Sequence, residues 1–313
     1  MKRDNILSRS FFHSLLKLTR FGNLVIIALT QYFTAGFLIG MHTLNDFKLL
    51  LLSVSTVSIA AGGYIINDYF DVNIDQVNKP AKMVVDKVIH RRWAIAWHMI
   101  LSVAGIVLTA LALSVKEKWY LILANMAVVI LLWIYSTTYK KSLLIGNIII
   151  ALLTAWTILI VYFSKIDITE VIAAEDLERQ AKFFRLTILY ASFAFIISLI
   201  REAVKDMEDM TGDAKYNCRT MPIIWGVNAT KIYVAVWLIV VVVMLLVIQA
   251  YILPYGWWVP IVYCLLFIIS PLINIFSRLF KSSSQQEFHI LSNRTKFVML
   301  TGILSMIFFA FYL

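Results

Sequence analysis

The chain has 313 residues, of which 61% are hydrophobic and 15% charged, whereas soluble domains are roughly 45–50% apolar and about 25% charged. One water-soluble core cannot bury that excess, so a soluble globule, a disordered chain and a disulfide scaffold are excluded. The two cysteines indicate neither a disulfide nor a zinc framework. The formal net charge is +10, but no basic stretch is interleaved with stacking aromatic residues, so no nucleic-acid partner is expected. The composition indicates an integral membrane protein.

Nine apolar runs of about 20 residues are long enough to cross a membrane as helices. In chain order they are Phe21–Gly40, Phe47–Ile66, Trp93–Leu113, Trp119–Thr137, Leu143–Phe163, Phe183–Ile200, Ile232–Leu253, Trp257–Ser277 and Lys296–Leu313. The polar intervals are each about thirty residues or fewer, too short for a separate soluble domain. The sequence therefore predicts an all-α membrane protein with one domain over residues 1–313.

The basic residues predict how these spans are oriented. If the N-terminus is cytoplasmic, 21 of the 28 Lys and Arg residues fall on the cytoplasmic side. This bias predicts a cytoplasmic N-terminus, and an odd number of spans then places the C-terminus outside. The first run has a long basic lead and no small-residue cleavage site after it, so we expect a retained helix rather than a signal peptide. A chain of this kind is consistent with a prokaryotic cytoplasmic membrane.

Acidic residues are concentrated at the predicted cytoplasmic ends of the second and sixth spans. One window places Asn67, Asp71 and Asp75 at i, i+4 and i+8, and the other places Asp206, Asp209 and Asp213 at i, i+3 and i+7. Each spacing puts three oxygen-bearing side chains on one helical face, where repulsion between like charges requires a cation nearby. If the two acidic windows were merely solvated helix ends, nearby basic residues would supply this positive charge. These residues are Lys79, Lys82, Arg201 and Lys205.

The four-span separation of the two windows instead predicts a shared site. It is the spacing expected of a duplicated four-helix unit, spans 1–4 and 5–8, followed by a ninth span. Carboxylates with few His or Cys nearby favour hard divalent cations, and Mg²⁺ commonly bridges carboxylates to substrate phosphates. We therefore expect a metal-bound diphosphate substrate.

Several other polar residues are candidates for contact with that substrate. The basic ones are Lys82, Lys140, Arg201, Lys205 and Arg219. Tyr135 precedes Lys140 by five residues, and without a motif it would be read as a membrane-interface tyrosine. Asn23 is a further substrate-binding candidate, although a hydrogen bond between helices explains an amide in the first span equally well.

Three motifs resemble those of the UbiA-type membrane prenyltransferases. They are NDYFDVNID at residues 67–75, YSTTYK at 135–140 followed by Gly146-Asn147, and DMEDMTGD at 206–213. The resemblance covers nearly the whole chain. It implies a helical bundle with a central cavity and cytoplasmic cap loops, in which two Mg²⁺ ions bind a prenyl diphosphate.

Carried over to this sequence, the resemblance implies six metal ligands and four catalytic residues. The metal ligands would be Asn67, Asp71, Asp75, Asp206, Asp209 and Asp213, and the catalytic residues Asp71, Asp209, Lys140 and Tyr135. Lys140 and Tyr135 would contact the diphosphate and line the path of the allylic cation. The product would be a prenylated lipophilic acceptor, and no protein partner is expected.

The second motif most resembles the digeranylgeranylglyceryl phosphate synthase-like branch, which geranylgeranylates geranylgeranylglyceryl phosphate. The first motif is also similar to chlorophyll and homogentisate prenyltransferases, which leaves an aromatic, quinone-precursor or chlorophyll-like acceptor as the alternative. Val77 and Asn78 replace the Arg-Thr pair of the 4-hydroxybenzoate and haem enzymes, which argues against those substrates. After Pro80 the chain also lacks the Pro and Gly that shape a cap loop in related branches.

A cation-coupled transporter is the rival from another class, since transporters also contain repeated bundles and intramembrane acids. The acidic residues here lie at predicted span ends rather than at the midplane, and no corresponding pair of Gly- or Pro-broken spans occurs. The sequence therefore favours an enzyme.

Overall fold

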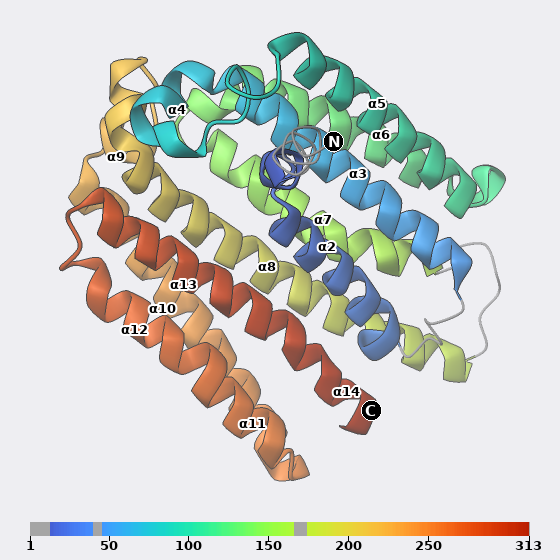
Figure 1. Cartoon of the computed structure of the whole chain (residues 1–313). Coiled ribbons are helices and arrows are strands. Elements are labelled where there is room, and N and C mark those ends of the chain that lie inside the picture. The colour runs from blue at the N-terminus through green and yellow to red at the C-terminus, as the bar shows by residue number, and fades with distance from the viewer. Residues whose placement is uncertain (1–12, 40–45, 166–173, 313) are drawn as a thin grey trace, which may run out of the picture. The chain divides into compact units, whose positions relative to one another are not determined.

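The computed structural model describes residues 13–39, 46–165 and 174–312, and these residues are almost entirely helical (Figure 1). Within this part of the chain there are two compact units: unit 1 with residues 13–32 and 46–140, and unit 2 with residues 33–39, 141–165 and 174–312. Nine of the described helical segments are long and apolar enough to cross a membrane. The all-α integral membrane fold is therefore confirmed.

Unit 1 contains three whole segments, the first segment as far as Tyr32, and a short helix between the second and third segments. Its helices are α2 (Phe21–Phe33), α3 (Phe47–Phe70), α4 (Val72–Asn78), α5 (Arg91–Ala112) and α6 (Val115–Thr137). α3 and α5 approach closely at Gly105, where an added Cβ would lie 2.5 Å from Ile59 Cγ1. Ser55 Oγ donates to Gly105 O at 2.7 Å, and Asn125 Nδ2 donates to Thr109 Oγ1 at 2.9 Å. These buried hydrogen bonds hold α3, α5 and α6 together where lipid offers no partners.

The segment after α4 folds onto the core of unit 1. Val84, Val85 and Ile89 are buried there. Asp86 has φ +70°, a left-handed conformation that glycine adopts most readily and that Asp tolerates better than most residues. Its Oδ2 accepts a hydrogen bond from Arg91 Nε at 3.2 Å. The turn is thus formed without a glycine.

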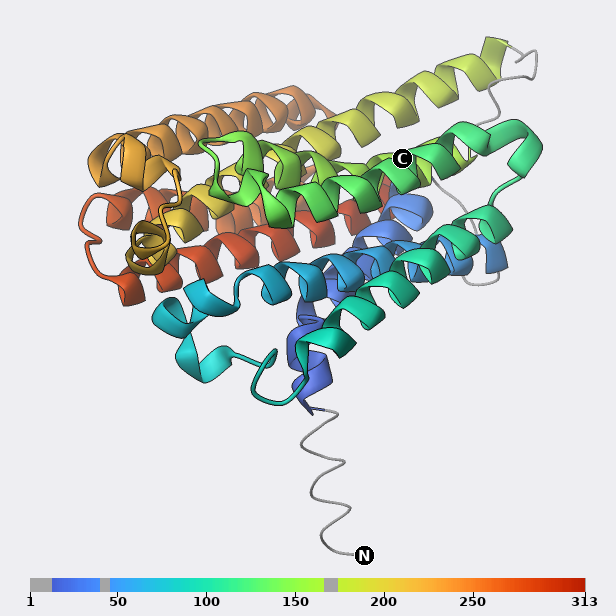
Figure 2. The same ribbon diagram turned by 90° about the horizontal axis from the view of Figure 1, so that it is seen from above.

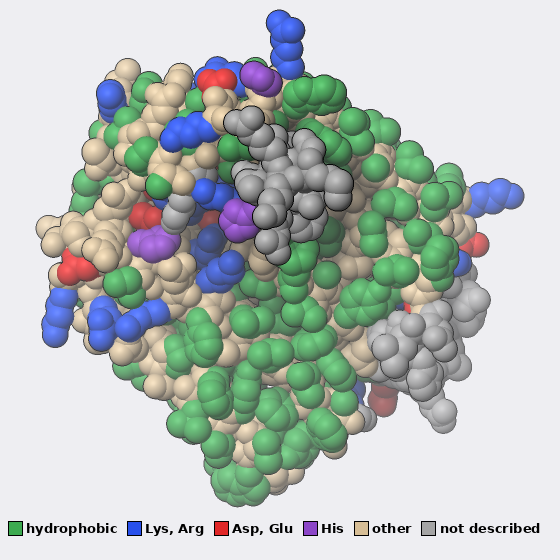
Figure 3. All heavy atoms as spheres, viewed as in Figure 1, with side chains coloured by type: hydrophobic (Ala, Val, Ile, Leu, Met, Phe, Trp, Pro, Cys, Tyr) green, Lys and Arg blue, Asp and Glu red, His purple; other side chains and the backbone are tan. Residues whose placement is uncertain are grey.

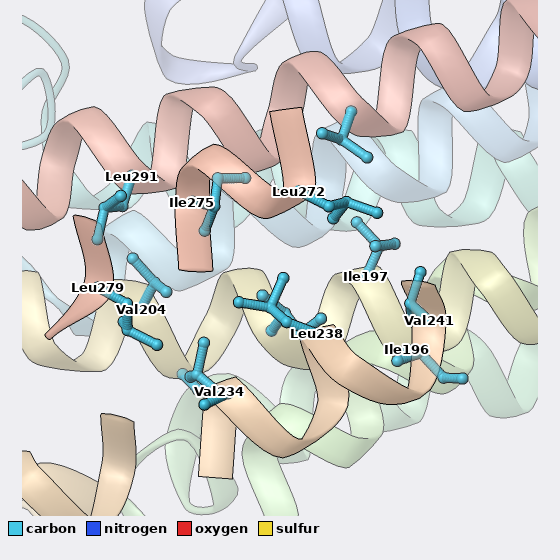
Figure 4. Packing of buried hydrophobic residues seen from close by; sticks show 14 of the residues in the cluster. Ile196, Ile197, Val204, Val234, Leu238, Val241, Leu272, Ile275, Leu279 and Leu291 are labelled. Atoms are coloured by element: carbon cyan, nitrogen blue, oxygen red, sulfur yellow. The ribbon is translucent and has the colours of Figure 1, made fainter. Parts of the chain in front are cut away.

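Unit 2 is organised around one helix of 42 residues, α8, which runs beside α7 and α10 (Figure 2). Its helices are α7 (Ile145–Lys165), α8 (Ala174–Lys215), α9 (Met221–Ile224), α10 (Val227–Ile252), α11 (Trp258–Cys264), α12 (Ser270–Leu279), α13 (Gln285–Leu304) and α14 (Phe309–Tyr312), with π-helical turns at Thr34–Leu38 and Leu265–Ile269. The core is largely aliphatic, and it includes Ile197 of α8, Leu238 of α10, Leu272 of α12 and Leu291 of α13 (Figure 4).

Two predicted spans are shorter than the helices that contain them. The sixth, Phe183–Ile200, is the middle of α8, which continues to Lys215, so Arg201 and Lys205 lie in a helix and not in a loop. The ninth, Lys296–Leu313, begins eleven residues too late, because α13 starts at Gln285. Hydropathy detects the apolar part of a helix, whereas backbone hydrogen bonding continues through polar residues.

The remaining predicted spans agree with the helices to within five residues at their described ends. Gly40 and Leu313, the predicted ends of the first and ninth spans, lie outside the described residues. The start of α13 carries a sequence signal that hydropathy does not detect. Ser284 and Glu287 form a capping box, in which Ser284 Oγ accepts from Glu287 N and the Glu287 carboxylate accepts from Ser284 N.

Candidate functional site

The first aspartate motif lies where α3 ends and α4 begins. Asp71 occupies the junction, with φ −87° and ψ −4°. Asp71 N donates to Asn67 O at 3.0 Å and Asp75 N donates to Asp71 O at 2.8 Å, so helical spacing continues across the junction. Asn67 Nδ2 donates to Asp71 Oδ2 at 2.7 Å. The predicted i, i+4, i+8 arrangement is therefore present in unit 1.

Lys140 supplies the cation that this cluster requires. It lies in a 3₁₀ turn, Tyr139–Lys141, directly after α6, and its Nζ forms an ion pair with Asp71 Oδ2. The Asp71 carboxylate is almost fully buried. Burial is the largest single influence and acts to lower the pKa of Lys140, but the charge of Asp71, the hydrogen bond to Asp71 and the other neighbouring groups together outweigh it, so the pKa is raised and Lys140 stays protonated.

In the described residues Asp75 has no ion-pair partner comparable to Lys140, and its pKa is changed by its surroundings. Burial, followed by the charge of Asp71, raises the pKa of Asp75 from 3.8 to about 6. Asn67 Oδ1 is also buried and has no hydrogen-bond donor in the described part of the chain. An additional cation would satisfy this acceptor and offset the repulsion between the two carboxylates.

The second motif lies on α8, which is uninterrupted from Ala174 to Lys215. Asp206, Asp209 and Asp213 therefore keep the predicted helical spacing. Asn147, two residues after the start of α7, donates from Nδ2 to Asp206 Oδ2 at 2.8 Å. This hydrogen bond fixes the Asp206 side chain to a second helix of unit 2.

The basic candidates on α8 are engaged with an acid of the same helix. Arg201 Nη1 lies 2.8 Å from Glu202 Oε1, and Lys205 Nζ lies 3.7 Å from Glu202 Oε2. This is the neutralising arrangement weighed above for a solvated helix end. Their contact with a substrate stays a prediction.

The other candidates lie in different surroundings. Tyr135 is buried on α6, rather than exposed at a membrane interface, and its charge contributes to the pKa of Lys140. Asn23 Nδ2 donates to Tyr64 Oη at 3.4 Å, which is the bond between helices considered above. Arg219 is exposed after α8, and its backbone N donates to Lys141 O at 2.8 Å. The side chain of Lys82 lies outside what the structure describes.

Two contacts near the motifs were not predicted. Arg20 Nη2 lies 2.9 Å from Asp68 Oδ1, and its guanidinium lies 4.9 Å from the centre of the Tyr64 ring. Asn147 was noticed only as part of a motif. Arg20 and Asp68 are 48 positions apart, and Asn147 and Asp206 are 59 apart. The sequence offers two signals for these contacts: Asp68 lies within the first motif, and Asn147 is a polar residue at the start of an apolar run.

The donor set suits a magnesium ion that depends on its substrate. In the described ranges, no three His, Cys, Asp or Glu side chains are gathered closely enough to hold a metal by themselves. Mg²⁺ is commonly bound by one or two carboxylates together with waters and substrate phosphates. The unsatisfied amide oxygen of Asn67 and the adjacent carboxylates of Asp71 and Asp75 fit that pattern.

Comparison with known proteins decides the family. The profile of the UbiA prenyltransferase family matches residues 29–310. The chain belongs to this family. As a UbiA protein it is a membrane prenyltransferase, and the resemblance inferred from its motifs is confirmed.

Among its relatives, the digeranylgeranylglyceryl phosphate synthase of Saccharolobus solfataricus is 31% identical over 272 residues, covering 82% of each chain. A match to the synthase of the same name from Thermococcus gammatolerans is 30% identical and covers 61% of this chain and 62% of that protein. A UbiA homologue from Archaeoglobus fulgidus, solved bound to GPP and Mg²⁺, has a TM-score of 0.57 at 17% identity and covers 94% of this chain and 99% of its own. The structural likeness shows a shared fold.

Proposed function

We propose that this UbiA enzyme transfers a geranylgeranyl group from its diphosphate to geranylgeranylglyceryl phosphate. The observation that carries the proposal is the 31% identity to the S. solfataricus synthase over 82% of both chains. The branch-like second motif, DMEDMTGD, supports the same acceptor. The acceptor hydroxyl would lose its proton as its oxygen bonds to the first carbon of the prenyl group, and the diphosphate would leave with the electron pair of the broken carbon–oxygen bond and take up that proton.

The six motif residues are proposed to hold two Mg²⁺ ions. They are Asn67, Asp71 and Asp75 in unit 1 and Asp206, Asp209 and Asp213 in unit 2. The A. fulgidus relative, which was solved with Mg²⁺ and GPP, supports this use of magnesium. When bound, magnesium supplies Lewis-acid neutralisation of the leaving diphosphate.

Lys140 is proposed to bind the diphosphate. Its charged ammonium group is held beside Asp71 and has three donors, so it can donate to a phosphate oxygen while remaining near the carboxylate. Tyr135, buried nearby on α6, would present an aromatic face to the allylic cation and exclude water from it. Asn147 would act on Asp206 as a positioning residue.

The remaining expectations belong to the same proposal. The two motifs would form one site, and spans 1–4 and 5–8 would be a duplicated unit. The substrates would also be contacted by five further polar residues: Arg201, Lys205, Arg219, Lys82 and Asn23. The positive-inside bias supports a cytoplasmic N-terminus in a prokaryotic cytoplasmic membrane.

The test is a transfer assay on purified protein with labelled geranylgeranyl diphosphate and Mg²⁺. Geranylgeranylglyceryl phosphate and homogentisate are offered separately, and products are resolved by mass. We expect a diether phosphate product only, abolished by chelator and by Asp71→Ala or Asp209→Ala in protein that remains folded in detergent. A prenylated homogentisate alone would replace the acceptor and keep the enzyme class. Activity in either alanine variant would contradict the two-metal proposal.

Replacing Lys82 tests whether the loop after α4 recognises the phosphate of the acceptor. We expect Lys82→Met to raise the KM for geranylgeranylglyceryl phosphate with little change in the KM for the prenyl diphosphate. An unchanged acceptor KM would remove Lys82 from the proposed site.

A further inference from the structure

A groove of about 530 Å³ lies between α12 and α13 in unit 2, away from both aspartate motifs in the sequence. Its lining combines polar and apolar side chains and contains no acidic residue. The lining residues are Ser270, Pro271, Asn274, Ile290, Asn293, Arg294 and Phe297. Both helices are parts of segments that are long and apolar enough to cross a membrane, and the groove lies beside the polar first half of α13.

Arg294 is the charged residue of the groove. It is half-buried, and its Nη1 donates to Asn274 Oδ1 across the groove. Throughout the described ranges Arg294 has no acidic partner. It lies nine residues beyond the start of α13, about 14 Å along the helix axis. Arg294 therefore lies two residues before the apolar run that begins at Lys296, where the polar first part of the helix meets its apolar part.

The neighbouring acids are already bonded to other groups. The Glu287 carboxylate accepts from Ser283 N at 2.8 Å and Ser284 N at 2.9 Å. Glu208 Oε1 lies 2.9 Å from His289 Nδ1, and His289 Nε2 lies 3.2 Å from Asn293 Nδ2. In the described part of the chain no carboxylate is paired with Arg294, so its positive charge is available to an anion from outside the chain.

The groove lies near a basic end of the helix pair. Side chains of a helix lean toward its N-terminus, so Arg294 leans toward the turn that joins α12 and α13. Arg278 and Lys281 are exposed at this turn. Basic side chains gather at this end of the pair, and hydrophobic side chains cover α11 to α13 further along (Figure 3). Ile290 and Phe297 are each more than 40% exposed beside the groove.

We propose that this groove binds the phosphate headgroup of an anionic glycerophospholipid from the surrounding membrane. Arg294 donates charge-assisted hydrogen bonds to the phosphate, and Asn274, Asn293 and Ser270 provide polar contacts for the glycerol and its substituents. Ile290 and Phe297 contact the first methylene groups of a lipid chain. Basic recesses between membrane helices are a known class of anionic-lipid site. The groove lining includes none of the residues proposed above for prenyl transfer, and this proposal does not depend on the acceptor proposed above.

The test is native mass spectrometry of the purified protein in neutral detergent with phosphatidylglycerol or phosphatidylcholine of identical chains. We expect preferential retention of phosphatidylglycerol, weakened about tenfold or more by Arg294→Gln. Arg185→Gln removes an equal charge from an exposed position on α8 and is expected to leave retention within twofold. Equal retention by the wild type and Arg294→Gln would overturn the proposal.

A second variant tests the proposal independently, in case Arg294→Gln does not fold. Ser270 is exposed, so Ser270→Phe is expected to fold with an unchanged unfolding temperature in detergent, while filling the groove and reducing phosphatidylglycerol retention. Unchanged retention in this variant would also contradict the proposal. Inorganic phosphate, at the same concentration as the lipid, is expected not to displace it. Displacement would show that the groove binds a free anion rather than a lipid.

Discussion

Lys140 Nζ forms an ion pair with Oδ2 of Asp71, which lies 69 positions earlier in the chain. The pair connects the turn after α6 to the junction between α3 and α4. It provides the countercharge for a carboxylate that is almost fully buried. The lysine that is proposed to bind the diphosphate is thus held beside a proposed metal ligand before substrate arrives.

Removing Lys140 should reduce both activity and stability. We expect Lys140→Gln to lower the rate of transfer at saturating substrates roughly 100-fold or more, because a charged donor to the leaving group is lost. In metal-free protein, the free energy of unfolding should fall by about 1–3 kcal/mol, because Asp71 loses a charged partner. Kinetics and denaturant unfolding measure the two effects. Lys141→Gln, an exposed neighbour, is the matched control and should retain near-normal activity; an equal loss there would refute a specific role for Lys140.

Asp75 predicts a pH dependence of stability in the metal-free protein. Its pKa in the folded state, about 6, exceeds the ordinary 3.8, so the folded state favours the protonated form. The stabilisation is complete below about pH 4 and is lost as the pH rises through about 6. The unfolding temperature of the wild type should therefore fall relative to that of Asp75→Asn across this interval. Parallel profiles for the two proteins would contradict the raised pKa.

Asn147 should affect activity through Asp206. We expect Asn147→Ala to weaken activation by Mg²⁺ about 10–100-fold, the usual effect of removing a hydrogen bond to a metal ligand. The measurement is the Mg²⁺ concentration at half-maximal rate. Thr154→Val, which removes the 3.2 Å contact with Ser198 between the same two helices, should leave this concentration unchanged. Equal shifts in both variants would show that Asn147 acts only through helix packing.

The contact at Gly105 makes a prediction about stability alone. An alanine Cβ there would overlap Ile59, so Gly105→Ala should lower the free energy of unfolding by about 1–3 kcal/mol. Gly302 lies in α13 with nothing within 4 Å of an added Cβ. Gly302→Ala should instead be neutral or stabilising by up to about 1 kcal/mol. Thermal unfolding in detergent distinguishes the two, and similar changes in both would show that Gly105 is not closely packed.

The sequence predicted the spans and the spacing of the two aspartate motifs because both depend on local periodicity. Apolar runs of about 20 residues identify membrane helices, and i, i+3, i+4 spacing places side chains on one face whatever the tertiary structure. The same local information missed where α8 and α13 extend through polar residues. In α13 these residues include Glu287, His289 and Arg294, which lower its hydropathy without ending the helix.

Local periodicity could not predict which residues contact the motif residues. The repulsion between Asp71 and Asp75 predicted a nearby cation, but the residues considered for that role were Lys79, Lys82, Arg201 and Lys205, whereas Lys140 was expected to bind the diphosphate. The contact of Lys140 with Asp71 depends on how helices distant in sequence pack, whereas the pairs of Arg201 and Lys205 with Glu202 are local to α8. The hydrogen bond from Asn147 to Asp206 depends on the same packing.

The continuity of α8 determines how its acidic residues can respond to ligands. A helix of 42 residues is about 63 Å long, roughly twice the thickness of the hydrocarbon layer, so much of it must extend into the aqueous or headgroup region. Its backbone hydrogen bonds fix the separations of Asp206, Asp209 and Asp213 along the axis. Adjusting those separations would require breaking the helix, so any fitting to substrates of different size falls to side-chain rotamers and to the other elements that surround them.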